Sequence, residues 1–344
     1  MDYKGLATLS ILVVSKTASL LSNMLRSIPT GLGSYGDDVE VLCSWNGTND
    51  EEQTVEVPPG IELYFAQRIP YHFSSNVNRL AERACGELLL LANDDLIFGP
   101  GSIEHSTRAL KEHSNTGIVG AKLINTNGKV DHSGILFDHS HKPFHRYRGA
   151  ATNHPFVERT ELVPATTGAF MLTRAADFSR CPMNENYAYN GEDIEICLSY
   201  KSRLGLNTLY CHEACCIHPE RTTRGHEVID RGFGNDNSED LSRLRKARLD
   251  HLLGLNSDET RWELSLASRE ASYWHAIAED NIAPTSELAI SRKATQELRL
   301  QARAQAVECE RLMGELDIAN LAANSLKAEL QAMQWRSEQR TGNR

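Results

Sequence analysis

The chain has 344 residues, which is long enough for two structural units and a sizeable hydrophobic core. Its formal net charge of -10 comes without clustered Lys and Arg, which argues against a nucleic-acid-binding protein. The eight cysteines are irregularly spaced, which is unlike a secreted disulfide framework. The first apolar run is too short to span a membrane. We therefore expect a cytoplasmic protein with no transmembrane segment, and we leave open peripheral contact at the inner face of a membrane.

Short apolar runs alternate with helical patterns from residue 7 to about residue 220. This order predicts βαβ units and a mostly parallel sheet that is covered on both faces. In the first half we expect strands at 9–14, 39–45, 62–66 and 87–92. We expect helices at 19–28, 74–85 and 103–113, the last with Ser102 as its N-cap.

The second half of this region has a more antiparallel pattern. The segments 117–124 and 129–138 are joined at Asn127-Gly128, a strong hairpin signal. Beyond them we expect a strand at 169–174, a helix at 192–205 that ends at Gly205, and strands at 206–211 and 214–220. The predicted fold class is therefore α/β, with a Rossmann-like mixed sheet flanked by helices.

A composition change near residue 235 marks the second predicted unit. Ala, Leu, Glu, Arg and Gln dominate 235–344, so we predict domains at 1–234 and 235–344, the second an all-α, coiled-coil-like extension. Apolar residues between 298 and 333 follow a heptad seam. The seam fits a helix folded onto its own chain, for example onto 241–255, or one paired in a homo-oligomer or with a helical partner, and both remain open.

Two acidic clusters stand out. Asn93, Asp94 and Asp95 directly follow the buried strand 87–92, at the end where open α/β sheets bind ligands. Adjacent carboxylates there suit a hard divalent cation that also meets phosphate oxygens. The second cluster, Glu192 to Glu195, opens the helix 192–205. Acids are common in a first helical turn, so this cluster taken alone favours an idle, solvated helix start over a catalytic role.

Four segments taken together resemble the family 2 glycosyltransferases of the GT-A fold: "LLLLANDD", "TTGAFMLTR", "YAYNGEDIEICLSYKSRLG" and "CIHPERTTRG". The similarity runs from about residue 9 to 225 and leaves the helical extension uncovered. It implies a GT-A type sheet and an inverting transfer of a sugar from a nucleotide-diphosphate donor to a hydroxyl of a saccharide acceptor. It also implies a divalent metal, Mn or Mg, and an enzyme similar to hexosyl- or rhamnosyltransferases acting in polysaccharide biosynthesis.

The resemblance assigns roles to the two acidic clusters. Asp95 and the later His218 match the metal ligands of the family, and Asp193 matches the base that deprotonates the acceptor hydroxyl. Glu192 is its neighbour and would orient the acceptor. An ion and a base placed in this way would neutralise the leaving diphosphate and activate the incoming hydroxyl.

The resemblance also implies a set of contacts to the nucleotide sugar. Their positions are Val13, Ser15, Trp45, Asn78, Asn93, Asp94 and Arg224. Val13 and Ser15 match the edge that holds the base, and Arg224 matches a loop cation that reaches the diphosphate. Ser44 and Trp45 replace the usual acid after the second strand, so base contact is expected to shift to stacking on Trp45.

The departures from the family pattern keep one other function open, and a third is disfavoured. Asn93 in place of an acid, together with Trp45, leaves open a non-catalytic binding or scaffold protein built on a degenerate transferase domain. Nucleotidyl transfer is disfavoured because no Gly-rich, Lys-containing loop follows the first strand.

The segment 138–149 collects His and Arg residues. It is either a solvated loop or a contact for acceptor oxygens or an anionic carrier.

Overall fold

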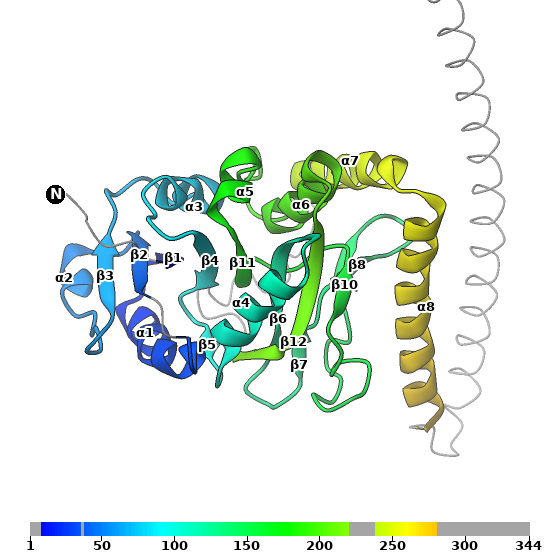
Figure 1. Ribbon diagram of the computed structural model, residues 1–344, viewed down its shortest axis with the longest axis horizontal. Helices are drawn as coiled ribbons and strands as arrows, with labels where there is room; N and C mark the ends of the chain where they lie inside the picture. Colours follow the sequence, from blue (N-terminus) through cyan, green and yellow to red (C-terminus); the bar gives the residue numbers. More distant parts are fainter. Residues whose placement is uncertain (1–7, 36–37, 220–237, 281–344) are drawn as a thin grey trace, which may run out of the picture. The chain divides into compact units, whose positions relative to one another are not determined.

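A computed structural model of the chain describes residues 8–35, 38–219 and 238–280 (Figure 1). The chain forms two compact units, Met1–Glu270 and Ala271–Arg344. The fold and the site below belong to the first unit. The predicted boundary at 234/235 and the heptad seam at 298–333 lie outside the described residues.

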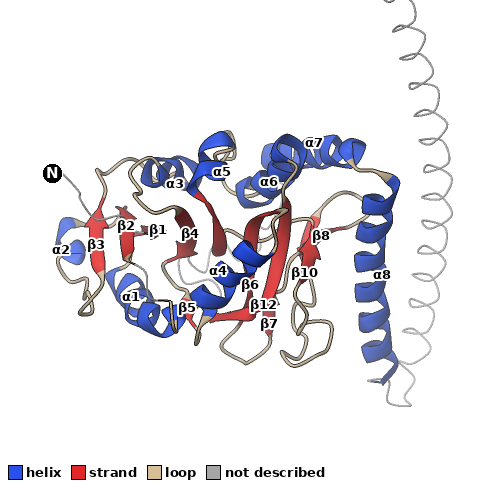
Figure 2. Ribbon diagram, viewed as in Figure 1, coloured by secondary structure: helices blue, strands red, loops and turns tan. Residues whose placement is uncertain are grey.

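The first unit is built on a ten-stranded mixed sheet with the order β10-β12-β6-β11-β4-β1-β2-β3, in which β5 pairs with β12 and β7 with β6 (Figures 1 and 2). The strands are β1 Leu9–Ser15, β2 Val39–Trp45, β3 Glu62–Phe65, β4 Leu88–Asn93, β5 Ile97–Phe98, β6 Thr116–Ile124, β7 Val130–His132, β10 Glu161–Val163, β11 Phe170–Arg174 and β12 Asn207–Ile217. Strands β1 to β4 are parallel, and β11 runs antiparallel between β4 and β6. A separate hairpin joins β8 Ile135–Phe137 to β9 Pro143–His145. The predicted mixed α/β sheet is confirmed.

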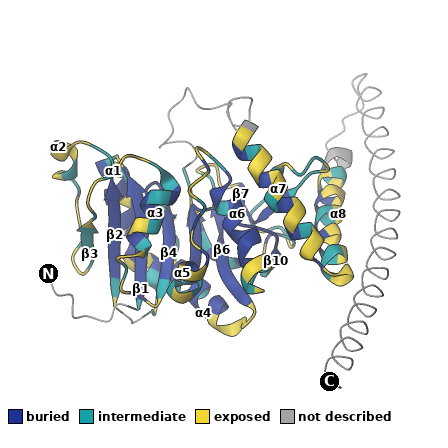
Figure 3. Ribbon diagram, turned by 90° about the horizontal axis from the view of Figure 1, so that it is seen from above, coloured by how far each residue is buried: buried dark blue, intermediate teal, exposed yellow. Residues whose placement is uncertain are grey.

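Helices cover both faces of this sheet. They are α1 Ala18–Leu32, α2 Asn49–Glu52, α3 Phe73–Ala81, α4 Ser102–Glu112, α5 Ala175–Arg180 and α6 Glu192–Ser199, continued by a π-helical turn at Tyr200–Leu204. In β1 the buried side chains alternate: Ile11 and Val13 pack with α1 and α4, whereas Leu12 and Val14 pack with α3, α5 and α6. Figure 3 shows the resulting buried layer of strands between more exposed helices.

Three local features differ from the expectations. Gly101, with φ of 65°, is the N-cap of α4, so Ser102 is the first helical residue. The two strands predicted at 206–220 form the single strand β12, with a register shift between Cys211 and Cys215. The hairpin at Asn127-Gly128 is present between β6 and β7, but the second strand ends early.

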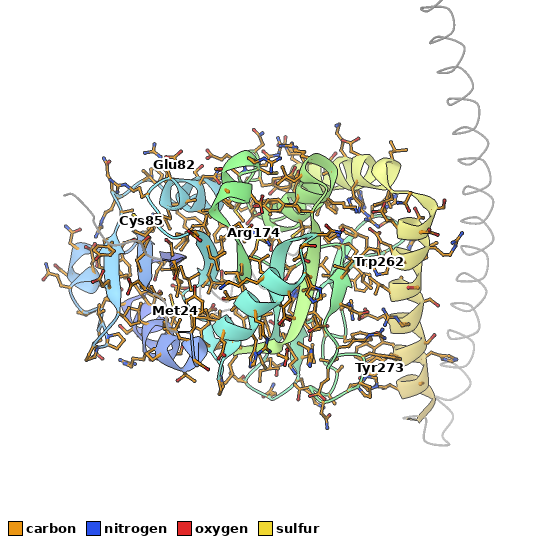
Figure 4. All side chains as sticks on the ribbon, viewed as in Figure 1. Met24, Glu82, Cys85, Arg174, Trp262 and Tyr273 are labelled. Atoms are coloured by element: carbon orange, nitrogen blue, oxygen red, sulfur yellow. The ribbon has the colours of Figure 1, made fainter. Side chains whose placement is uncertain are left out.

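Polar contacts attach the helices to the sheet. Arg174, at the end of β11, donates to the carbonyls of Leu110 (2.9 Å) and Thr116 (2.8 Å), which ties α4 to the sheet (Figure 4). The next described segment begins with α7 Ser238–Gly254, which packs against α6 and is followed by α8 Ser257–Asp280. The helical character expected after residue 235 is thus confirmed for the described part. None of the helices in the described ranges has the length and apolar character needed to cross a membrane.

Candidate active site

The carboxyl ends of three parallel strands meet at one edge of the sheet. Ser15 pairs with Trp45 across β1 and β2, and Val14 pairs with Asn93 across β1 and β4. Just beyond, the Ser15 hydroxyl donates to Asp94 Oδ2 (2.7 Å), and Asp94 is almost fully buried. The structure therefore brings Ser15, Asn93 and Asp94 together at the edge where ligands bind in open α/β sheets. The side chain of Val13 lies in the core.

Asp95 and His218 also come together, from the end of β4 and the end of β12. His218 Nε2 lies 3.4 Å from Asp95 Oδ1 and 3.4 Å from the amide nitrogen of Asn93. Its other ring nitrogen, Nδ1, lies 3.0 Å from a carboxylate oxygen of Asp131 on β7. Burial alone would lower the pKa of His218, but hydrogen bonds to Asp131 and Asp95 outweigh it and raise the pKa from 6.5 to about 9.

This arrangement fits a divalent cation. A metal-binding histidine usually donates its second ring N–H to a carboxylate, as His218 does to Asp131, which leaves Nε2 to face the ion. Asp95 supplies a carboxylate oxygen beside that nitrogen, and metal binding would displace the proton of His218. Among the described residues no three His, Cys, Asp or Glu side chains form a ready-made metal cluster, so ligands from the substrate would have to complete the coordination.

Asp193 lies in the first turn of α6, whose N-cap Gly191 has φ of 109°. A Cβ on Gly191 would come within 2.9 Å of the Tyr187 ring, so this tight turn depends on glycine. The carboxylate of Asp193 accepts hydrogen bonds from the backbone N–H groups of Gly168 (2.9 Å) and Ile194 (2.8 Å). The N–H of Gly168 thereby fixes Asp193 to the turn that precedes β11.

The other acids of this helix differ from Asp193. Glu195 is buried and accepts a hydrogen bond from Ser199 one turn later (2.8 Å), which is a structural contact. Glu192 is also buried, at 6% exposure. Asp193 is the partly exposed member of the cluster.

Two residues that were predicted to contact the nucleotide sugar make contacts within the protein instead. Trp45 is fully buried, donates its indole N–H to the carbonyl of Thr48 (2.9 Å) and meets Phe65 edge-on, so its ring offers no exposed face for a base. Asn78 on α3 donates to the carbonyl of Met183 and to Glu185, both at 2.9 Å, and accepts from the N–H of Met183. Its amide thus anchors the loop before α6.

Asp131 and His132 had no predicted role in the site, whereas Thr166 opens the segment "TTGAFMLTR" of the family resemblance. His132 on β7 is fully buried, and its Nε2 lies 2.9 Å from Thr166 Oγ1. Asp131 and His132 lie in the segment "VDHSG" of the predicted hairpin, which carries no recognisable site pattern. Arg224 lies outside the described residues.

Comparison with known proteins identifies the family. Residues 7–232 match the family model described as glycosyltransferase like family 2. The chain belongs to this family. The resemblance noted in the sequence is thereby confirmed, and the mixed sheet with flanking helices is the architecture it implied.

Two curated relatives match this glycosyltransferase-like chain. O-antigen biosynthesis protein RfbC of Myxococcus xanthus is 27% identical over 238 residues, which cover 66% of this chain and 18% of the relative. Uncharacterized protein y4gI of Sinorhizobium fredii is 27% identical over 165 residues, covering 46% and 18% respectively. The chain thus spans less than a fifth of the length of either relative.

Solved structures with a similar arrangement include two that were determined with Mn²⁺. GalNAc-T7 with UDP and GalNAc has a TM-score of 0.48 and 13% identity, covering 64% of this chain and 45% of that one. The mannosyltransferase PcManGT from Pyrobaculum calidifontis, with GDP-Man, has a TM-score of 0.47 and 13% identity, covering 86% and 81%.

Proposed function

We propose that the protein is an inverting, metal-dependent glycosyltransferase. It would move a sugar from a nucleotide-diphosphate donor to a hydroxyl of a saccharide acceptor, with Mn or Mg as cofactor. The observation that carries this proposal is the convergence of Asp95 and His218 at the sheet edge, with Asp131 orienting the imidazole. The name of the Myxococcus relative, an O-antigen biosynthesis protein, favours a polysaccharide precursor as the acceptor.

Donor binding would use the edge formed by β1 and β4. Asp95 and His218 would hold the metal ion, whose charge stabilises the leaving diphosphate. Ser15 keeps the Asp94 carboxylate in one orientation beside this position, where it would meet the donor. Arg224 remains a sequence-based prediction for contact with the diphosphate.

Acceptor activation would fall to Asp193. The N–H of Gly168 holds one oxygen of the carboxylate and the N–H of Ile194 holds the other, so the group has a fixed direction. Each oxygen keeps a further lone pair for the proton of the acceptor hydroxyl. A single displacement with Asp193 as general base inverts the anomeric centre. Glu192, its buried neighbour, would support the acceptor site.

The test is a transfer assay over a panel of nucleotide sugars with Mn²⁺, run on the wild type, Asp193→Asn and Glu195→Gln. We expect Asp193→Asn to lower kcat by about 10² to 10⁴-fold, the usual contribution of a general base, with donor binding retained. Glu195→Gln is the matched control, because Glu195 bonds within its own helix. If Asp193→Asn turned over at the wild-type rate, Asp193 would not be the base. If the wild type bound no nucleotide sugar, the alternative of a non-catalytic scaffold protein would be favoured.

A further inference from the structure

A pair of imidazoles lies next to Thr166, at the start of the turn whose Gly168 N–H holds the candidate base. His132 on β7 and His145 on β9 have their Nδ1 atoms 2.9 Å apart, and their rings are nearly perpendicular with centroids 5.0 Å apart. His132 is fully buried, whereas His145 is partly exposed. Two facing ring nitrogens hydrogen-bond only when one carries a proton and the other does not.

The surrounding hydrogen bonds decide which nitrogen is protonated. The backbone N–H of Gly134 donates to His132 Nε2 (3.2 Å), so that nitrogen carries no proton, and the Thr166 hydroxyl can donate to it as well (2.9 Å). The proton of neutral His132 is therefore on Nδ1 and is donated to Nδ1 of His145. His145 must then carry its own proton on Nε2.

Both rings are neutral in this arrangement. Burial lowers the pKa of His132 well below its ordinary value, and it also lowers the pKa of His145. The nearby charge of Arg148 acts in the same direction on His145, while Asp131 and Asp193 act against it. The backbone of the turn thus fixes His145 as a neutral hydrogen-bond donor through Nε2.

The position of His145 places this donor on the acceptor side of the site. His132 contacts Thr166, two residues before Gly168, whose N–H holds Asp193, and His145 lies opposite Ile135 in the β8–β9 hairpin. The β8–β9 hairpin bridges to Ala165, at the start of the turn that holds Asp193. In the sheet order, β6 and its partner β7 are separated from the donor-binding strand β1 by β11 and β4.

We propose that the Nε2–H of His145 is a binding contact for a hydroxyl oxygen of the saccharide acceptor, held ready by His132. The identity of the ligand rests on the proposed function, whereas the protonation pattern does not. A neutral donor suits a neutral hydroxyl oxygen, and it places the acceptor close to Asp193 without adding charge there. His145 is a positioning residue, and Asp193 remains the base.

The first test reads the protonation state directly and needs no substrate. The ¹⁵N spectrum of histidine-labelled full-length protein at neutral pH should show His145 protonated at Nε2 and bare at Nδ1, and His132 the reverse. His132→Asn keeps a donor near Nδ1 and should preserve the His145 signal. His132→Leu removes that donor and should give His145 a mixture of tautomers. A His145 proton on Nδ1, or a charged His145, in the folded wild type would overturn the proposal.

The second test is kinetic. His145→Leu should raise the KM for the acceptor about tenfold, the value of one lost hydrogen bond, and leave hydrolysis of the donor by water unchanged. His145→Gln restores an N–H near the Nε2 position and should recover most of this loss. His139→Gln, on the exposed turn of the same hairpin, is the control and should behave as wild type.

The two tests separate the failure of this inference from the failure of the proposed function. If the wild type neither binds nor hydrolyses nucleotide sugars, the proposed function fails, and the ¹⁵N pattern still decides the arrangement of the histidine pair. If transfer occurs and His145→Leu has an unchanged acceptor KM, the acceptor contact is wrong. An equal loss of donor hydrolysis and transfer in His145→Leu would also contradict it, because it would indicate damage to the donor site.

Discussion

At the scale of single residues, the pair formed by Asp131 and His218 makes a sharp prediction. Asp131 accepts from Nδ1 of His218 and so leaves Nε2 to face Asp95. Loss of such a supporting carboxylate typically weakens metal binding 10- to 100-fold. We expect Asp131→Asn to lower the affinity for Mn²⁺ by about this factor, measured by electron paramagnetic resonance with and without a nucleoside diphosphate.

Asp50→Asn is the control for this experiment, because Asp50 lies exposed on α2. It should leave the affinity for Mn²⁺ unchanged. An Asp131→Asn protein that is folded and binds Mn²⁺ as tightly as the wild type would show that His218 does not need this carboxylate, and would weaken its assignment as a ligand.

The candidate site residues that the structure brings together are those whose position follows from strand ends. Ser15 and Asn93 meet because parallel strands end at a common edge. Trp45 and Asn78 could not be judged in the same way, since burial of an indole or saturation of an amide depends on packing by distant segments. Asp131 was missed for the same reason: its partner His218 is remote in the sequence, and no local pattern marks such a pair.

At the scale of elements, the sequence predicted most strands and helices but not their interruptions. The helix expected at 192–205 changes to a π-helical turn at Tyr200 and then ends at Gly205, whose φ is 71°. Gly134, with φ of 106°, separates β7 from β8, where one continuous strand was expected. Such breaks depend on backbone conformations that a hydrophobic pattern does not record.

The packing of α7 on α8 depends on a buried carboxylate and therefore on pH. Glu263 accepts from Arg248 Nη1 (3.1 Å) and from His251 Nε2 (2.9 Å). Burial alone would raise its pKa, but these hydrogen bonds outweigh it and lower the pKa from 4.5 to about 2. The ionised group therefore contributes roughly 3 kcal/mol above pH 4.5, and this contribution is lost as the pH falls from 4.5 toward 2.

The difference in unfolding free energy between wild type and Glu263→Gln should follow that dependence. We expect a difference of about 3 kcal/mol at pH 7, shrinking steadily below pH 4.5, in urea titrations at a series of pH values. Glu239→Gln on α7 is the control: Glu239 is exposed, and its pair with Arg243 should give a difference near zero at every pH. A Glu263→Gln difference that stays constant from pH 7 to pH 3 would contradict the linkage.

At the scale of the whole molecule, the mixed sheet divides the proposed chemistry between its two halves. The parallel strands β1 to β4 would provide the donor edge, whereas Asp131 lies on β7 and His218 directly follows β12. The antiparallel strand β11 joins the halves, and the turn before it holds Asp193. A metal ion bound by Asp95 and His218 would therefore connect both halves, and its effect should appear in the stability of the entire first unit.

Ligand binding should accordingly raise the melting temperature only when metal and nucleotide sugar are present together. A ligand at 100 times its Kd adds about 2.7 kcal/mol to the stability of the native state, which for a unit of this size corresponds to a shift of roughly 5 to 10 °C. Scanning calorimetry of the full chain with a panel of nucleotide sugars, in Mn²⁺ or in a chelator, measures this shift. Asp95→Asn should lose the Mn²⁺-dependent part, because it removes the charged ligand but keeps the shape of the side chain. An equal shift in Mn²⁺ and in chelator would mean that the donor binds without the ion, and the metal-dependent part of the proposed function would then be wrong.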